Sequence, residues 1–407
     1  MNILIVEPEI NGHHLVMYVR FLIRGLAKNN INFSILTSKK IKRHPAFKIL
    51  KKEKKNIKYL FLEDLKYPKN KSLISLLLFQ FSNYKKIKEG YEKISKKYIF
   101  DHIFLTTIDH IDKVIPFLGS PFGDKKFSSI ILNPKNHLNE YKLAKYNFKK
   151  FFYDFVINNI LKQDCLEYLY SNDPLFTEYS KKKFFKYKDK IYHFNEPVEI
   201  NNLKNKKKVK KNLNFRNKDF IILVYGAIKN SKSIFDLVEV LTHKNLNKDI
   251  KVLLSGKQTD EVKKFLKSKN CINLINQKRL VIMNKFLSIN EEEKVFSISD
   301  LIWIVYKNSS LGSSGVLFLA KKARIPIITS KFGIPYWLNK KYKLGPSVEL
   351  NDKKNIIKIL NKLSDRKNFY QKYKENIHKR SNINFVRNFY LMILDNLKLL
   401  KYSKNKN

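Results

Sequence analysis

Short apolar runs alternate with amphipathic stretches along most of this chain, and this alternation constrains the fold more strongly than any other feature of the sequence. In the first half the runs have the length and the β-branched or aromatic content of strands, at residues 3–6, 33–37, 57–62, 102–106, 129–132 and 167–170. The clearest helical pattern between them spans residues 14–28, where Leu15, Val19, Leu22, Ile23 and Leu26 recur on one face. Strands separated by helices predict a parallel sheet with crossover connections.

The alternation stops at residues 201–218 and then starts again. That segment is rich in Asn and Lys and has few large apolar residues, which is typical of a linker or of an exposed helical lead-in. Beyond it, predicted strands at 220–225, 250–254, 272–275, 301–305 and 326–329 alternate with predicted helices at 234–241, 259–266, 290–298 and from 316 onward. Two more helical patterns follow at 353–363 and 384–399.

At 407 residues the chain exceeds one typical core. We therefore predict an α/β fold of two tandem Rossmann-like doubly wound domains, with a cleft between them and helices at the C-terminus. The predicted domains are 1–200 and 219–380, joined by a linker at 201–218 and followed by a C-terminal helix and tail at 381–407. Ligands of such sheets bind at the carboxyl ends of the strands, so the residues that follow the strands are the candidates for a site.

The chain is strongly basic, with 82 Lys and Arg against 35 Asp and Glu and a net charge of +47. Such a surface attracts polyanions, anionic lipid headgroups and acidic substrates. The basic residues are spread from end to end among abundant Asn, Ile, Phe and Tyr, as an A/T-rich coding sequence produces, so we interpret most of them as solvated surface rather than as a nucleic-acid groove. The clusters at 39–43 and 204–211 are candidates for contact with an anionic membrane.

Cysteine usage and apolar runs indicate the compartment. Cys165 and Cys271 lie far apart and form neither a disulfide framework nor a metal-ligand spacing, which favours a reducing environment. The first residues lack the basic and long apolar regions of a signal peptide, and the longest apolar run, 73–81, is too short to span a bilayer. We expect a cytoplasmic protein, either free or peripheral on the inner face of the plasma membrane.

An anion site is predicted where a turn opens a helix at Gly312, Ser313, Ser314 and Gly315, after the strand expected at 301–305. At such a turn, unpaired backbone N–H groups gather beside the positive end of the helix dipole, which suits a phosphate. The alternative is an ordinary strand-to-helix turn with a serine N-cap.

A second group of candidates follows the strand at 220–225, where Gly226 allows a tight turn and Lys232 lies beside the start of a helix. A nest of backbone amides facing this ammonium can neutralise a diphosphate. Lys229 is interpreted as a solvated lysine. Gly256, Phe286 and Tyr306 are further candidates for this site.

In the first domain, the loop after the first strand ends in His13 and His14, where the long helix opens. Because histidine titrates near neutral pH, either imidazole can act as a general base or bind an acceptor phosphate, whereas the alternative is that one of them caps the helix or packs beneath the loop. Asp109 and His110 occupy a comparable strand end, as does His137. No nucleophile–base–orienter set and no metal-ligand cluster can be assembled from the spacing, so no metal site is predicted.

The order of these motifs resembles a GT-B glycosyltransferase of family 4, the glycosyl transferases group 1, between residues 195 and 348. The segment 195–198 is similar to the family's interdomain segment, and Gly226 and Lys232 are similar to the glycine and lysine that embrace the donor diphosphate. The strand that enters the donor site, the donor loop and helix, and the strand that follows have their counterparts at 299–304, 312–320 and 326–330 with Gly333. The N-terminal half agrees in layout only.

Three positions depart from the family pattern. The family often carries two glutamates where this chain has Leu311 and Leu319, and an arginine where it has Ala227. The usual ribose and sugar contacts, and a retaining outcome, are therefore not carried over. The Ser-Ser-Gly turn resembles a subgroup associated with bacterial surface polysaccharides.

The resemblance implies a glycosyltransferase that moves a sugar from a nucleotide-diphosphate sugar to a glycan or polyprenyl-diphosphate-linked acceptor in lipopolysaccharide or capsule biosynthesis. The diphosphate is expected on the amides of Ser313, Ser314 and Gly315 and on the ammonium of Lys232, and the acceptor near His13 and His14. Neither a cofactor nor a metal is expected, because backbone dipoles and the lysine carry the leaving-group charge. Specific nucleic-acid binding is not expected either.

Two other functions stay open. A non-hydrolysing nucleotide-sugar 2-epimerase shares the two-domain build and a Ser/Gly donor turn, although that family places two acids where this chain has Phe318 and Leu319. The alternative from a different class is a basic protein that uses the same scaffold to bind nucleic acid or a membrane.

Overall fold

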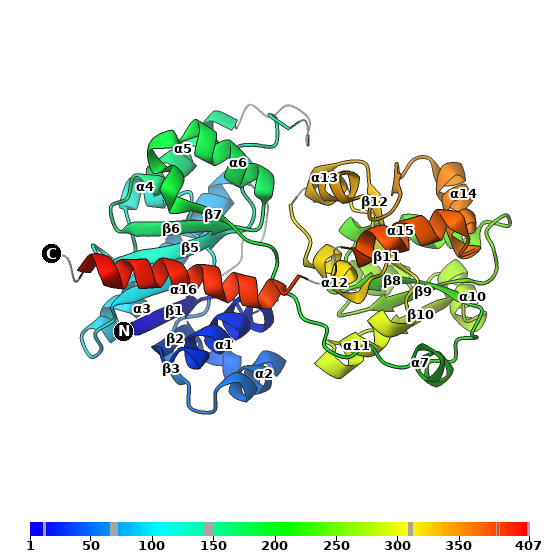
Figure 1. Ribbon diagram of the computed structural model, residues 1–407, viewed down its shortest axis with the longest axis horizontal. Coiled ribbons are helices and arrows are strands. Elements are labelled where there is room, and N and C mark those ends of the chain that lie inside the picture. The colour runs from blue at the N-terminus through cyan, green and yellow to red at the C-terminus, as the bar shows by residue number, and fades with distance from the viewer. Residues whose placement is uncertain are drawn as a thin grey trace. The chain divides into compact units, whose positions relative to one another are not determined.

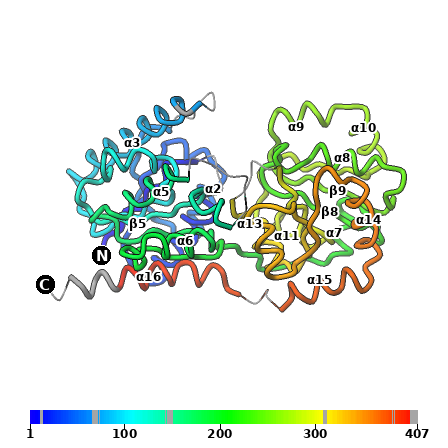
Figure 2. Tube along the Cα trace, turned by 90° about the horizontal axis from the view of Figure 1, so that it is seen from above, coloured from blue at the N-terminus to red at the C-terminus, as the bar shows by residue number. Residues whose placement is uncertain are grey.

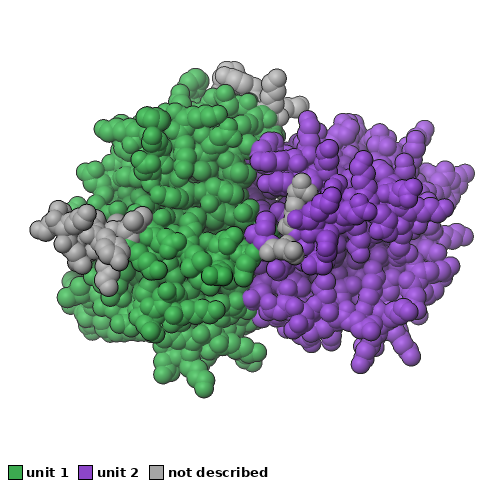
Figure 3. All heavy atoms as spheres, viewed as in Figure 1, with its two compact units in different colours: residues 1–197, 384–407 green, residues 198–383 purple. Residues whose placement is uncertain are grey.

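The computed structural model describes residues 1–10, 14–65, 72–141, 143, 150–307, 312–379, 381 and 383–404. The chain forms two compact units (Figures 1 and 3): unit 1 comprises Met1–Pro197 and Asn384–Asn407, and unit 2 comprises Val198–Ile383. Each unit is built on one parallel sheet with helices on its faces. The predicted α/β fold of two Rossmann-like domains is confirmed.

The sheet of unit 1 has seven parallel strands in the order β3-β2-β1-β4-β5-β6-β7. The strands are β1 (Asn2–Glu7), β2 (Asn32–Ser38), β3 (Lys58–Leu62), β4 (His102–Leu105), β5 (Phe127–Ile131), β6 (Leu166–Ser171) and β7 (Ile191–His193). The first six overlap the runs that the sequence predicts. The sequence does not predict β7, because three residues are too few to show a pattern.

Helices cover both faces of this sheet (Figures 1 and 2). They are α1 (Arg20–Lys28), α2 (Pro45–Glu53), α3 (Leu73–Ser95), α4 (Ile115–Leu118), α5 (Lys150–Leu161), α6 (Pro174–Lys183) and α16 (Phe385–Lys404). Successive strand residues point to opposite faces, so Ile3 and Ile5 pack with α1, α2 and α16, whereas Leu4 and Val6 pack with α3, α4, α5 and α6.

Two features of unit 1 differ from a simple repetition of strand and helix. The helix predicted at 14–28 begins with a wider π-helical turn, Leu15–Val19, before α1. The C-terminal helix α16, predicted as a separate element, packs against α1 so closely that a Cβ at Gly25 would overlap Tyr390. The last helix of the chain therefore belongs to the core of unit 1.

The sheet of unit 2 has six parallel strands in the order β10-β9-β8-β11-β12-β13. The strands are β8 (Phe220–Tyr225), β9 (Ile250–Ser255), β10 (Leu280–Met283), β11 (Leu301–Ile304), β12 (Ile327–Ser330) and β13 (Ser347–Val348). The helices are α7 (Lys206–Asn212), α8 (Ile234–Thr242), α9 (Asp260–Phe265), α10 (Lys269–Asn276), α11 (Ile289–Ile298), α12 (Gly315–Ala323), α13 (Gly333–Tyr342), α14 (Lys353–Ser364) and α15 (Asn368–His378).

The strand predicted at 272–275 is wrong, because these residues lie in α10 and the third strand of the unit is β10. Cys271 and Leu274 are buried, whereas Ile272 and Ile275 are 46% and 37% exposed. That spacing is the buried face of a helix. A short apolar run does not show by its period alone whether it forms a strand or a helix.

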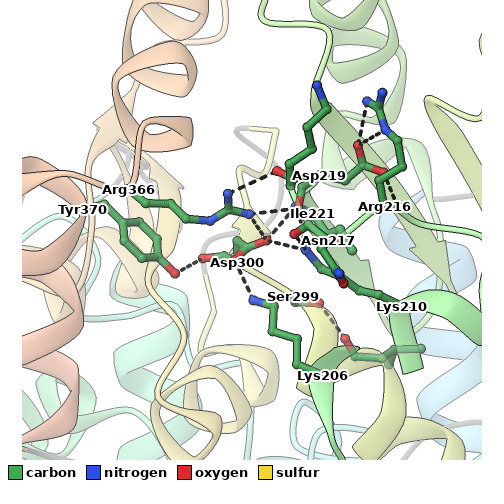
Figure 4. A network of polar contacts seen from close by, with 12 residues as sticks. Lys206, Lys210, Arg216, Asn217, Asp219, Ile221, Ser299, Asp300, Arg366 and Tyr370 are labelled. Carbon is green, nitrogen blue, oxygen red and sulfur yellow. Dashed lines mark hydrogen bonds and ion pairs between the residues drawn. The ribbon is translucent and has the colours of Figure 1, made fainter. Parts of the chain in front are cut away.

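The segment predicted as a linker or helical lead-in contains α7, which is tied to unit 2 by charged groups (Figure 4). The buried carboxylate of Asp300 accepts hydrogen bonds from Lys206 Nζ at 2.7 Å and from Arg366 Nη2 at 3.1 Å. It also accepts one from the backbone N–H of Ile221 at 3.0 Å, and Tyr370 donates to the Asp300 carbonyl. This network lies at the amino ends of β8 and β11, so it braces the sheet at the edge opposite the strand ends where ligands bind.

Candidate functional site

The candidate site of unit 2 lies where the strand order reverses. In the order β10-β9-β8-β11-β12-β13, the first strand of the unit, β8, pairs with β11. Connections leave these two strands in opposite directions, and in open α/β sheets this is the point at which ligands bind. The loop 226–233 follows β8, and the turn 312–315 opens α12 after β11.

Two glycines let β8 and β9 end close together. Gly226 and Gly256 both adopt positive φ, 88° and 141°, which side chains disfavour. A Cβ at Gly256 would overlap the carbonyl oxygen of Gly226, and a Cβ at Gly226 would lie 3.4 Å from Lys232 Nζ. Steric contacts therefore explain why glycine occurs at both predicted positions, and the missing side chain of Gly226 leaves room for Lys232.

Lys232 folds back over this turn, and its Nζ donates a hydrogen bond to the Tyr225 carbonyl. Burial, together with the charge of Lys229, lowers the pKa of Lys232 to about 7. In the part of the chain that the structure describes, no carboxylate forms an ion pair with this ammonium. Lys232 is thus a partly buried cation whose countercharge is missing, which is the state expected of a residue that binds an anion.

The end of β11 holds the lysine loop in place. Trp303, which is 1% exposed, donates from Nε1 to the Lys232 carbonyl at 3.0 Å. The backbone N–H of Lys307 donates to the Ser231 carbonyl at 2.9 Å. The sequence gives no signal for either contact, because both join residues about 70 positions apart that only the sheet topology brings together.

The serine turn is not an ordinary serine cap. Ser314 is the N-cap of α12, yet its side chain makes no capping hydrogen bond. Its Oγ lies 2.8 Å from the hydroxyl of Tyr306, whose own backbone N–H donates to Ser330 Oγ at 3.2 Å. The hydroxyl of Ser313 is buried and has no hydrogen-bond partner among the described residues. The first amides of α12 are therefore left for another acceptor, together with the Ser313 hydroxyl.

The other predicted residues of unit 2 lie along the same edge of the sheet. Gly312 is the first residue of the turn, and Phe286, which is 43% exposed, follows β10 beside the end of β9. Leu319 lies in α12 and is buried. Leu311 lies outside the described residues.

Unit 1 has a matching reversal between β1 and β4, where acids and imidazoles meet. His14 Nδ1 lies 3.6 Å from Glu7 Oε2 and 3.9 Å from Glu9 Oε2. His110 Nε2, from the loop after β4, lies 2.9 Å from Glu9 Oε2. The other predicted histidine, His13, lies outside the described residues.

The charge of His14 decides what it can do. Burial alone lowers the pKa of His14, but the close approach of Glu7 and the charges of Glu7, Glu9 and Asp109 outweigh it and raise the pKa to about 9. At neutral pH this side chain is an imidazolium, which already holds the proton that a general base would take up. Of the two predicted roles, the geometry favours contact with an anion.

The carboxylate of Asp109 is hydrogen-bonded to the residues around it. Its carboxylate accepts hydrogen bonds from Thr107 Oγ1 at 2.7 Å and from the backbone N–H groups of Leu132 and Asn133, both at 2.8 Å. These bonds hold the ends of β4 and β5 together. His137 is fully buried with its Nε2 3.0 Å from Asp173 Oδ2, at the N-cap of α6.

The sequence reasoning missed a buried carboxylate below this edge. Glu196 accepts from the Tyr18 hydroxyl at 2.7 Å and from Asn172 Nδ2 at 2.6 Å, and burial raises the pKa of Glu196. The only signal in the sequence is an acid beside Pro197 in the segment similar to the family's interdomain segment. Its partners lie as far as 178 positions away, so spacing does not reveal them.

Comparisons with known proteins agree with this architecture. Residues 205–380 match the family model of glycosyl transferases group 1. The structure of Anabaena Alr3699/HepE in complex with UDP and glucose is 14% identical over 98% of this chain and 99% of its own, with a TM-score of 0.64. Sucrose-phosphate synthase from Thermosynechococcus elongatus is 12% identical over 99% of both chains, with a TM-score of 0.68.

A third solved structure, WaaG, a glycosyltransferase involved in lipopolysaccharide biosynthesis, is 10% identical over 93% of this chain and 95% of its own, with a TM-score of 0.60. At these identities the likeness establishes a shared fold. No curated protein matches the sequence. Within the described ranges, no helix has both the length and the apolar content of a membrane span.

Proposed function

We propose that the chain is a GT-B glycosyltransferase of group 1 that transfers a sugar from a nucleoside-diphosphate sugar to a glycan or polyprenyl-diphosphate-linked acceptor of a bacterial surface polysaccharide. In this proposal unit 2 binds the donor and unit 1 binds the acceptor. Complexes of HepE with UDP and with UDP-glucose support the donor class, and the role of WaaG in lipopolysaccharide biosynthesis supports the acceptor class.

One observation carries the donor site: a cation without a countercharge and a helix start without a side-chain cap follow the two strands of the reversal point. A diphosphate supplies both a negative charge for the cation and hydrogen-bond acceptors for the amides at the helix start. Its oxygens can accept from the amides of Gly315 and Val316, from Ser313 Oγ and from Lys232 Nζ. Hydrogen bonds to charged groups contribute about 1.5–3 kcal/mol each, so three of them contribute about 4.5–9 kcal/mol, and the upper end of this range corresponds to micromolar binding.

The base and ribose are placed along the same edge, over Gly256 and between Phe286 and Tyr306. The ring of Phe286, which is 43% exposed, offers a face on which a planar base can stack. The family's glutamates are absent, so aromatic contacts rather than carboxylates hold the nucleoside in this proposal.

The acceptor is placed at the reversal point of unit 1. The imidazolium of His14 and the pair formed by Glu9 and His110 supply a cation for an acceptor phosphate and carboxylate oxygens for sugar hydroxyls. Catalysis then depends on holding donor and acceptor in one geometry.

We further propose that no metal takes part, because Lys232 and the amides of α12 neutralise the charge that develops on the leaving diphosphate. Donor binding and transfer should therefore be unchanged in EDTA and unchanged by added Mg²⁺ or Mn²⁺. Loss of transfer in EDTA that is restored by a divalent ion contradicts this part of the proposal.

The test of the donor site is titration calorimetry of the full chain with UDP and GDP. Lys232→Ala removes the ammonium, and Gly315→Pro removes one amide donor at a helix position that accepts proline. The backbone of Ser314, at φ −132° and ψ 112°, is already in the region favoured before proline, so the second variant should fold.

Each variant should weaken binding by about 10- to 100-fold, as expected for one charge-assisted hydrogen bond. Lys229→Ala removes a neighbouring lysine that supplies only the smaller part of the lowered pKa of Lys232, so it is the matched control and should change affinity little. Failure to bind any nucleoside diphosphate, or equal binding by all variants, rejects the site. Conversion of the donor sugar to its epimer without an acceptor rejects transfer as the reaction.

A further inference from the structure

Two surface features of unit 1 take no part in either site. One is the apolar stripe, formed by Ile74, Leu78 and Phe81 on α3. The other is the basic cluster, formed by Lys39, Lys40, Lys42 and Arg43 in a 3-10 turn that follows β2.

The apolar stripe is an exposed face of a helix. Ile74, Leu78 and Phe81 are 72%, 65% and 51% exposed. Their spacing places them on neighbouring turns along one side of α3, whereas Tyr84 and Ile87 of the same helix are buried against the sheet. Large apolar side chains that gather on one exposed face mark a surface that meets another apolar phase.

The basic cluster has almost no acidic neighbours. Its four cations are exposed, and only Ile41 within the turn is buried. Lys40 pairs with Asp64 at 2.6 Å, whereas Lys39, Lys42 and Arg43 form no ion pair with any described residue. Lys42 lies over the ring of Phe61, which keeps its ammonium at the surface. The turn thus presents three uncompensated positive charges.

Contacts at the end of β3 connect the basic cluster to α3. Asp64, just after β3, accepts hydrogen bonds from Ser38 at the start of the basic cluster, and its carbonyl accepts one from Lys86 of α3. Lys86 also lies 3.7 Å from Glu63. The end of β3 therefore contacts both the basic cluster and α3, where Lys86 lies five residues beyond the last side chain of the apolar stripe.

Both features lie at the carboxyl edge of the sheet, where the acceptor is placed. The cluster directly follows β2. On α3, Gln80 lies between Leu78 and Phe81 in the sequence and donates a hydrogen bond to the Asp109 carbonyl at 3.0 Å, beyond the end of β4. Figure 2 shows α3 along the upper border of unit 1. A surface bound here lies at the edge of the sheet that carries Glu9 and His110.

We propose that the apolar stripe and the basic cluster form one surface that docks unit 1 on an anionic lipid bilayer. Apolar side chains that enter the acyl boundary and cations that contact anionic headgroups are the two contributions to interfacial binding. The net charge of +47 adds long-range attraction to the same partner. The inference rests on the proposed function only in explaining why a lipid-linked acceptor would be met at this edge.

The composition of the surface selects this partner over two others. A second copy of the chain would bring two positive clusters together, which like-charge repulsion opposes. Single-stranded nucleic acid is bound through successive aromatic rings beside cations, whereas only Phe81 of the three stripe side chains offers a ring to stack on.

The test is co-sedimentation of the full chain with vesicles of phosphatidylcholine alone and of phosphatidylcholine mixed with phosphatidylglycerol. The protein should bind the mixed vesicles and bind the neutral ones much more weakly, and added salt should weaken binding. Two variants probe the surface separately: Ile74→Ser/Leu78→Ser/Phe81→Ser and Lys39→Gln/Lys42→Gln/Arg43→Gln. All six side chains are exposed, so both variants should fold, and each should lower the partition coefficient by about tenfold or more.

Two matched controls make equal changes elsewhere. Ile99→Ser/Phe117→Ser/Phe151→Ser removes three exposed apolar side chains from other parts of unit 1, and Lys207→Gln/Lys208→Gln/Lys211→Gln removes three charges from α7 in unit 2. Both controls should bind vesicles nearly as the parent does. If the controls lose as much binding as the two surface variants, nonspecific electrostatic or hydrophobic attraction accounts for vesicle binding and the proposed surface is wrong.

Titration with UDP separates this inference from the donor site. The two surface variants should bind UDP like the parent, and Lys232→Ala should lose UDP affinity but keep vesicle binding. Normal UDP binding without vesicle binding overturns the docking surface and leaves the donor site standing. Binding to RNA in place of anionic vesicles also overturns it.

Discussion

Lys232 is the residue on which the donor site depends, and its pKa makes it testable. The pKa of about 7 lies below the ordinary lysine value of 10.5, because burial disfavours the charged form. Above pH 7 the free protein therefore holds this side chain largely neutral. A bound diphosphate stabilises the ammonium and raises its pKa again, so binding takes up a proton.

We expect the affinity for UDP to fall by up to about tenfold per pH unit above pH 7, with little dependence on Lys232 below it. Calorimetry in two buffers of different ionisation enthalpy measures the proton uptake directly. Lys232→Ala should abolish this uptake, whereas Lys229→Ala should retain it. Binding without proton uptake near pH 8 contradicts the assignment of Lys232 to the diphosphate.

For His14 we predict a shift in the opposite direction, since its acidic neighbours raise its pKa to about 9, above the ordinary histidine value of 6.5. Its interaction with Glu7 therefore stabilises the fold fully below pH 6.5, and this contribution is lost as the pH rises through about 9. Glu7→Gln should lower the pKa of His14 more than Glu9→Gln does, because the Glu7 carboxylate lies nearer to Nδ1, at 3.6 Å against 3.9 Å. An NMR titration of the imidazole measures the pKa of His14 in the parent and in both variants. A pKa near 6.5 in the parent protein would contradict the raised pKa.

Single residues that follow strands were predictable from the sequence, because the chemistry of a turn is local. Gly226, Gly256 and Ser314 have a visible reason to occur next to a strand or a helix. Partners were not predictable: the contact between Glu7 and His14 and the one between Tyr18 and Glu196 both depend on how the chain folds back on itself.

At the scale of elements, β11 connects the parts of the donor site. Its Trp303 holds the lysine loop, and Tyr306, just after the strand, bonds Ser314 in the turn before α12. Both contacts come from β11 and the residues directly after it, so one short piece of backbone sets the positions of Lys232 and of the turn before α12.

Trp303→Phe keeps a buried ring but removes the hydrogen bond to the Lys232 carbonyl. We expect the affinity for UDP to fall by about 3- to 10-fold, which corresponds to the loss of one ordinary hydrogen bond. Proton uptake on binding should also change, because the lysine is held less closely over Gly226. Trp337→Phe removes the other tryptophan and is the control; an unchanged affinity in Trp303→Phe speaks against a positioning role.

The Asp300 network makes a separate prediction about stability. Burial raises the pKa of Asp300, but the charges and hydrogen bonds of Lys206 and Arg366 outweigh it and hold the pKa below its ordinary range. Asp300→Asn should lower the free energy of unfolding by ~3 kcal/mol, since it leaves Lys210 and Arg366 without a countercharge.

The stabilisation by Asp300 is present above the ordinary carboxyl pKa of ~4 and is lost as the pH falls below it. Asp249→Asn, which removes a more exposed carboxylate paired with Arg216, is the control and should cost less than ~1 kcal/mol. Denaturant unfolding at neutral pH and near pH 3 measures both effects. Equal losses for the two variants would show that the network does not brace the sheet.

Elements with a long periodic pattern were predicted well, and short ones were not. Strands β8 and β9 and helices α8 and α14 lie almost where the pattern places them. The two-residue β13 and the helices α13 and α15 are not in the prediction, and α10 was mistaken for a strand. Tertiary packing decides such short segments, because either conformation buries the same few side chains.

At the scale of the whole molecule, the two units share one topology but carry different chemistry at the same place. In each, the first and fourth strands pair at the reversal point. Unit 2 presents an uncompensated lysine and backbone amides there, whereas unit 1 presents carboxylates and imidazoles. Fold class follows from the pattern of the sequence, but this division of roles follows from the residues at the two reversal points.

The measurement that tests the central claim most directly is a crystal structure of the full chain grown with UDP. We predict that the two phosphates lie within hydrogen-bond distance of Lys232 Nζ and of the amides of Gly315 and Val316, with the uracil next to Phe286. A diphosphate bound elsewhere on the protein, or one at this edge that contacts neither Lys232 nor the start of α12, would contradict the account.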